Sequence, residues 1–186
     1  MGAVFLPTRA LRALLLAAVA VLASGMSLAE EYRTPSGVLR FDVPAGYTRL
    51  SDEEINVKFG RNGRVPAAVW GNARRSSSVA VTWTEMKNRP LNAAELPEFK
   101  KAMEQLLPRA TPGLRFLGND IVSIGAQQWV MFDSIAPAVD TEVRNLMYLT
   151  HLGGHMVGVN YNATTADFPG QRDGFEASAR TLAVGP

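Results

Sequence analysis

Alternation of apolar and polar residues predicts strands along much of the chain. In residues 37–43, Leu39, Phe41 and Val43 alternate with charged residues, which is typical of a strand with one buried face. Residues 79–85 have the same period of two and are rich in valine, threonine and tryptophan. Further strands are predicted at residues 57–59, 65–70, 121–124, 127–135, 143–151 and 155–163.

Short turns are expected to join several of these strands into hairpins. Asn62-Gly63 lies between two predicted strands, and both of its residues tolerate the positive φ that a tight hairpin requires. Gly125-Ala126 and Gly153-Gly154 lie between the two later pairs. Pro66 weakens its strand or places it at an edge of the sheet, because proline cannot donate a ladder hydrogen bond.

One segment between the strands has helical spacing instead. Asn92 and Glu95 have the spacing of a capping box. The apolar positions that follow recur every three or four residues, at Leu96, Phe99, Met103 and Leu106. We expect Phe99 and Met103 to be buried against the sheet and the helix to end near Pro108.

A second amphipathic helix is predicted near the end of the chain, from about Phe168 to Ala183. Phe175, Ala179 and Leu182 share one face of it. The resulting order is a first group of strands, a helix, four strands and a helix, with connections of hairpin length. This order predicts an α+β fold with a mostly antiparallel sheet of about six or seven strands and two main helices.

The first 29 residues have the pattern of a secretory signal peptide. Arg9 and Arg12 precede an uncharged apolar run from Leu14 to Leu22, and small residues follow around Ser27-Leu28-Ala29. The run is shorter than the roughly 20 residues that span a bilayer, so no membrane anchor is expected after cleavage; a retained N-terminal helix is the alternative. The sequence therefore predicts a signal peptide at 1–29 and a single domain at 30–186, located in the periplasm or secreted.

Composition excludes several chemistries. The chain has no cysteine, which excludes disulfides, a thiolate nucleophile and cysteine-ligated zinc. The formal net charge of +2 comes from Arg9 and Arg12 in the signal peptide, so the predicted mature domain is neutral. Global charge thus gives no argument for nucleic-acid binding.

Three sequence stretches resemble the PsbP-like superfamily. They are Gly37 to Tyr47, Gln128 to Asp133, and Asn145 to Tyr148 before the Gly-Gly turn, with a closing helix that contains Phe175 and Leu182. The resemblance covers nearly the whole of residues 30–186 and implies an α/β/α sandwich around an antiparallel sheet, used as a docking module and not as an enzyme. It carries over no functional residue, because the matching positions are packing patterns.

Charge is segregated along the chain. Residues 55–84 contain five basic residues and no acidic one, whereas residues 116–143 contain Asp120, Asp133, Asp140 and Glu142 and no basic one. The Asn62-Gly63 turn would place two arginines opposite each other, which is unfavourable unless an anion compensates. Arginine and aromatic residues are common in binding hot spots. The candidate partner-binding residues are Lys58, Arg61, Arg64, Trp70, Arg74 and Arg75. Two alternatives are that these cations lie against the chain's own acidic strands, or that they are simply solvated.

Other candidate sites are weaker. A two-residue turn would pair His151 with Met156 and put His151 and His155 on opposite faces. A three-residue loop would bring the two histidines together, but no third histidine or cysteine exists to complete a metal site. Ser76 to Ser78 lack the Gly-x-Ser-x-Gly context of a hydrolase. Carboxylate pairs from Asp133, Asp140 and Glu142 are of a kind that any small protein offers. We therefore predict no catalytic residue, no metal and no cofactor.

Large aromatic residues on the predicted strands have two readings. Trp83, Trp129, Tyr148 and Tyr161 have strand-like spacing, which favours a core role. The alternative is a ligand pocket between sheet and helix, lined by the same residues.

The sequence favours an exported, non-catalytic binding or accessory domain that docks a protein partner in the same compartment, in one version an immunity-type protein. A carrier of a small molecule or envelope lipid, with a cavity between sheet and helix, is the alternative, and a small hydrolase is a third. A large apolar cavity would favour the carrier.

Overall fold

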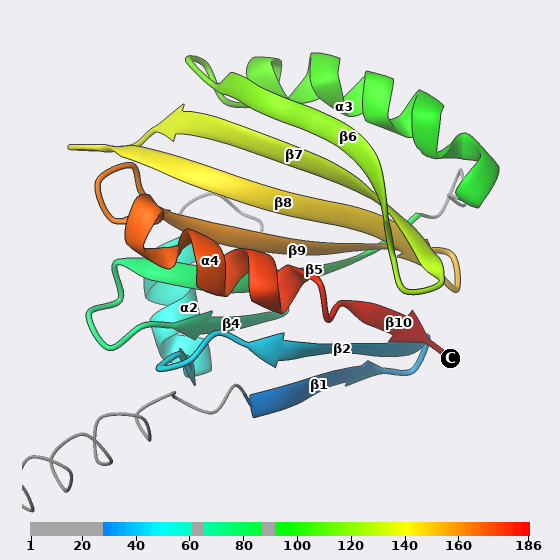
Figure 1. The fold of residues 1–186 in the computed structure, drawn as a ribbon, viewed down its shortest axis with the longest axis horizontal. Helices are drawn as coiled ribbons and strands as arrows, with labels where there is room; N and C mark the ends of the chain where they lie inside the picture. Colours follow the sequence, from blue (N-terminus) through cyan, green and yellow to red (C-terminus); the bar gives the residue numbers. More distant parts are fainter. Residues whose placement is uncertain (1–27, 61–64, 87–91) are drawn as a thin grey trace, which may run out of the picture.

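The computed structural model of this chain describes residues 28–60, 65–86 and 92–186. Within these ranges, a seven-stranded antiparallel sheet has the order β3-β4-β5-β9-β8-β7-β6, and a smaller sheet has the order β1-β2-β10 (Figure 1). The strands are β1 (Leu28–Thr34), β2 (Gly37–Val43), β3 (Thr48–Arg49), β4 (Ala68–Gly71), β5 (Ser77–Glu85), β6 (Arg115–Ile124), β7 (Gln127–Pro137), β8 (Glu142–Leu152), β9 (His155–Thr164) and β10 (Ala183–Gly185). The helices are α2 (Asp52–Phe59), α3 (Leu96–Ala110), which follows the 3₁₀ turn η2 (Ala93–Glu95), and α4 (Phe168–Ala179).

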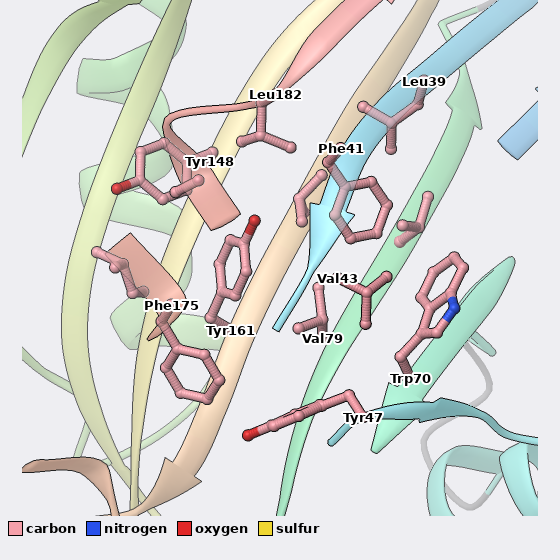
Figure 2. Close-up of a cluster of buried hydrophobic side chains, with 14 of the residues drawn as sticks. Leu39, Phe41, Val43, Tyr47, Trp70, Val79, Tyr148, Tyr161, Phe175 and Leu182 are labelled. Atoms are coloured by element: carbon pink, nitrogen blue, oxygen red, sulfur yellow. The ribbon is translucent and has the colours of Figure 1, made fainter. Parts of the chain in front are cut away.

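The main core lies between the large sheet and a layer formed by α4 and the small sheet (Figure 2). The alternating residues of β2 supply part of it, because Leu39, Phe41 and Val43 are all buried. Phe41 packs edge-on against Trp70, with ring centroids 5.2 Å apart. Phe175 of α4 contacts several aromatic rings of the same cluster. The apolar face that the period-two pattern gives to β2 is thus the face that packs on the core of the sandwich.

The opposite face of the large sheet is covered by α3 and α2 (Figure 1). Leu96 of α3 is fully buried against Val130, Phe132 and Leu149. Phe99 and Met103, expected to be buried, are only partly buried against this cluster. The sandwich predicted from the sequence is confirmed, with helices on both faces of a central antiparallel sheet.

The two later hairpins are confirmed. β6 and β7 pair through the Gly125-Ala126 turn, so that Ile124 faces Gln127. β8 and β9 pair through Gly153-Gly154, and His151 lies opposite Met156. Both turn glycines of the second hairpin have positive φ, 55° and 77°, a conformation that glycine adopts without a steric penalty.

The first predicted hairpin is wrong. Residues 57–59 are the last turn of α2, not a strand. Ser51 caps this helix: its side chain accepts from the Glu54 backbone N–H, and the Glu54 carboxylate accepts from the Ser51 N–H. Such a capping box stabilises the helical start and overrides the short apolar pattern. The Asn62-Gly63 turn lies outside the described residues.

Several element boundaries also differ from the prediction. Pro108 lies inside α3, which ends at Ala110. The last helix ends at Ala179, and residues 183–185 instead form β10 on the edge of β2. Residues 28–34 were not predicted as a strand, yet they pair with β2 along its whole length. Among the described residues, no helix has the length and apolar character needed to cross a membrane.

Candidate functional site

Three of the predicted partner-binding residues lie together at one corner of the molecule. Lys58 is in the last turn of α2, and Arg74 and Arg75 are in the turn between β4 and β5. The Lys58 Nζ donates to the Arg75 carbonyl oxygen at 3.2 Å, which joins the two elements. Arg61 and Arg64 lie outside the described residues. We call Lys58, Arg74 and Arg75 the basic corner.

Arg75 has a structural role in this corner. Its Nε and Nη2 donate to Glu54 Oε1 at 3.1 and 2.9 Å, and its Nη1 donates to Thr48 Oγ1 at 3.1 Å and to the Gly71 carbonyl at 3.3 Å. The residue adopts a left-handed φ of 57°, which is uncommon for a side-chain-bearing residue. Arg75 therefore holds the β4–β5 turn against α2 and β3, and its charge is matched by Glu54.

Arg74 has the opposite character. Its side chain is 73% exposed, and among the described residues its ion pair joins Nη2 to Asp167 Oδ1 at 3.5 Å. An exposed ion pair of that length contributes little to stability. The pKa of the neighbouring Lys58 ammonium is lowered by partial burial and by the charge of Arg75. Arg74 is thus the member of the basic corner most available to a partner.

Trp70 does not belong to this surface. It is 1% exposed, and its ring packs in the core against Phe41. Its position on the inner face of β4, between β3 and β5, explains why. The prediction that Trp70 lies on a docking surface is wrong, because Trp70 is a core residue.

The acidic strands do not neutralise the basic corner. Asp133 on β7 accepts two hydrogen bonds from Arg144 of the neighbouring strand β8. Glu142 accepts from Arg115 at 2.7 Å and 3.3 Å. The Arg115 side chain lowers the pKa of the Glu142 carboxyl, first through this hydrogen bond. One alternative from the sequence was that the basic residues lie against the chain's own acidic strands. Among the described residues, Lys58, Arg74 and Arg75 form no ion pair with Asp133 or Glu142.

The histidines and serines have local structural contacts. His151 and His155 occupy opposite faces of the sheet because they lie on either side of a two-residue turn, and His155 Nδ1 is 2.9 Å from the Gly153 carbonyl oxygen. Ser77 Oγ bonds the Tyr47 hydroxyl at 2.5 Å, and Ser78 Oγ donates to Asn162 at 2.8 Å. Within the described residues, no group of three or more metal-ligating side chains gathers.

An apolar groove lies between α3 and the large sheet, where the carrier alternative places a cavity, but none of the aromatic residues Trp83, Trp129, Tyr148 and Tyr161 lines it. Its volume is about 470 Å³. The lining residues are Thr84, Met86, Phe99, Ala102, Met103, Leu106 and Met156. The helical spacing that predicted α3 supplies one wall, and Met156 on β9 supplies the other. Phe99 and Met103 are partly exposed because they line this open groove.

No protein-family model matches the chain, and no curated protein sequence matches it. Solved structures share its fold. The cyanobacterial PsbP (CyanoP) of Synechocystis sp. PCC 6803 is 14% identical with a TM-score of 0.60, and the alignment covers 88% of this chain and 96% of CyanoP. LpqN of Mycobacterium tuberculosis, a protein involved in cell envelope biogenesis, is 11% identical with a TM-score of 0.59, covering 87% of this chain and 91% of LpqN. The fold is therefore the PsbP-like fold that the sequence resembles.

Proposed function

We propose that this protein is an exported, non-catalytic accessory domain that docks a protein partner in an extracytoplasmic compartment. The observation that carries the proposal is the exposed Arg74 side chain on a turn that Arg75 fixes in place. A fixed turn presents its cation with little conformational cost, and a rim charge of this kind accelerates association with an acidic partner. Lys58, Arg61 and Arg64 extend the same basic segment.

The signal-peptide pattern in the sequence of residues 1–29 supports the proposed compartment. The similarity in fold to LpqN, which is involved in cell envelope biogenesis, agrees with a role outside the cytoplasm. An immunity-type protein that neutralises a toxin in the same compartment is one specific version. Its partner would present a carboxylate-rich surface to the basic corner.

Site-specific photo-crosslinking tests the proposal in the native host. A photoreactive residue at position 74 should capture one envelope protein, whereas the same residue at Arg109, an exposed cation at the end of α3, should not. Charge reversal at Arg61, Arg64 and Arg74 should slow association with the captured partner, and added salt should do the same to the wild type. Equal capture from positions 74 and 109, or association indifferent to both charge and salt, would refute it.

The apolar groove favours a second function, a carrier of a small apolar molecule or envelope lipid. Methionine side chains adapt to varied apolar ligands, and the groove has the size of a small-ligand site. A fluorescent fatty acid such as cis-parinaric acid should bind the wild type, and Ala102→Trp should abolish the binding by filling the groove. Binding that survives Ala102→Trp would contradict the carrier function and leave the docking proposal untouched.

A further inference from the structure

A smaller, charged pocket lies on the other face of the large sheet, between α4 and strands β7 and β8. Its volume is about 250 Å³. Two regular spacings build its wall, because strand residues two apart and helix residues four apart point the same way. The lining residues are Met131 and Asp133 of β7, Arg144, Leu146 and Tyr148 of β8, Phe168, Arg172 and Glu176 of α4, and Arg180, which directly follows α4.

Two ion pairs fix most of the charge in this pocket. Arg144 donates from Nε and Nη2 to the two oxygens of Asp133 at 2.9 and 2.6 Å. The same guanidinium lies 4.5 Å from the centre of the Phe168 ring, so it is held by a bidentate pair and by a cation–π contact. Arg172 donates to Glu176 at 2.7 Å, one helical turn away. These four charges therefore balance one another.

Two polar groups are left without partners. Arg180 forms no ion pair with any residue in the described ranges, although it lines the pocket. The Tyr148 hydroxyl has no hydrogen-bond partner in the described part of the chain either, and it points away from the hydrophobic cluster in which its ring lies (Figure 2). Burial and the nearby charge of Glu176 raise the pKa of Tyr148. The hydroxyl is therefore protonated at neutral pH and can donate a hydrogen bond.

We propose that this pocket binds a small organic monocarboxylate. Its carboxylate accepts hydrogen bonds from the Arg180 guanidinium and the Tyr148 hydroxyl, and its apolar body lies against Met131 and Leu146. The pocket carries one uncompensated positive charge, which matches a single negative charge on the ligand. The carboxylates of Asp133 and Glu176 disfavour a second, so a phosphate dianion fits less well.

The site is separate from both surfaces considered above. It lies on the α4 side of the sheet, whereas the apolar groove lies on the α3 side. Neither Arg74 nor Lys58 lines it. The proposal thus stands or fails independently of the docking and carrier functions.

Titrations of the purified, isotope-labelled protein, followed by amide chemical shifts, test the proposal. Acetate, benzoate and phenylacetate are the probes, benzamide is the uncharged match for benzoate, and inorganic phosphate is the competing anion. At least one carboxylate should shift residues near Tyr148 and Arg180 saturably, with a dissociation constant in the millimolar range or tighter, while benzamide should not.

Two variants and a control identify the groups involved. Arg180→Gln should weaken carboxylate binding about tenfold or more, and Tyr148→Phe should weaken it about fivefold, as expected for charge-assisted and single hydrogen bonds. Arg109→Gln, which alters an exposed arginine at the far end of α3, should change nothing. The proposal is overturned if no probe carboxylate binds, if benzamide or phosphate binds as well as the carboxylates, or if Arg180→Gln binds like the wild type. Unchanged spectra of the variants away from the pocket confirm that they fold.

Discussion

Replacing Phe175 with alanine tests whether α4 is held to the sheet by its aromatic contacts. The Phe175 side chain is 0% exposed. Its ring centroid lies 5.4 Å from that of Tyr161, 5.7 Å from that of Phe168 and 6.0 Å from that of Tyr47. Truncation of a buried phenylalanine costs about 3–5 kcal/mol. With three ring partners lost at once, we expect the upper part of that range, about 4–5 kcal/mol.

Urea and thermal unfolding of the purified variant measure this cost. In a domain of this size each kcal/mol lowers the melting temperature by about 2–4 °C, so the midpoint should fall by about 8–20 °C. The control is Phe175→Leu, which keeps most of the volume and should cost clearly less, about 1.5 kcal/mol or under. A loss below about 1.5 kcal/mol for Phe175→Ala would refute the placement of α4 against the core.

Three further predictions concern packing, export and acid stability. A Cβ at Gly158 would lie 2.5 Å from Thr82 Oγ1 and 2.9 Å from Leu149 Cδ2, so Gly158→Ala should lower the free energy of unfolding in urea by about 1–3 kcal/mol. The control is Gly170→Ala in α4, where a Cβ meets no atom within 4 Å, and it should be neutral or stabilising. Val19→Asp should leave an uncleaved precursor in the cytoplasm on fractionation and immunoblotting; normal secretion would contradict the signal peptide. Hydrogen bonds, first from the Ser51 N–H and then from Arg75, lower the pKa of Glu54 below its ordinary 4.5. The ionised Glu54 carboxylate therefore stabilises the fold above that value, and this stabilisation is lost as the pH falls through the lowered pKa. Glu54→Gln should reduce the difference in melting temperature between pH 7 and pH 3, and an unchanged difference would refute the linkage.

The second half of the fold was predictable because its pairing information is local. Gly125-Ala126 and Gly153-Gly154 are two-residue turns, and a turn of that length fixes the register of the strands on both sides. The pairing of His151 with Met156, expected for a two-residue turn and not for a three-residue loop, is the one observed. By contrast, β1 and β10 pair with β2, and the three residues of β10 contain no pattern of their own. Such strands are stabilised by a distant partner that the sequence does not identify.

One local signal was present and was outweighed by a wrong one. Ser51 and Glu54 have capping-box spacing, and acidic residues fill the first turn of α2. The Asn62-Gly63 dipeptide predicted a hairpin instead, and a hairpin requires residues 57–59 to be a strand. The same hairpin placed Trp70 at the surface. Once residues 57–59 are helical, β4 lies between β3 and β5, and Trp70 faces the core.

The charged pocket could not be found from runs of charge, because cross-strand neighbours decide which charges meet. Residues 116–143 appeared purely acidic, yet Arg144 is the next residue. Ile135 lies opposite Arg144 and Asp133 lies opposite Leu146, so Asp133 and Arg144 are diagonal neighbours two residues apart. The run that seemed to offer free carboxylates thus ends at the arginine that pairs with one of them.

The α4 side of the pocket does have a signal in the sequence. Phe168, Arg172, Glu176 and Arg180 recur every four residues beside the buried stripe that predicted the helix. The sequence does not show which strand this second stripe faces in the fold. With β8 in place, Arg144 and Arg172 each have a carboxylate, and Arg180 is the pocket arginine without one among the described residues. Neutralising Arg180 therefore changes the charge available to a ligand while both ion pairs and the buried face of α4 stay intact.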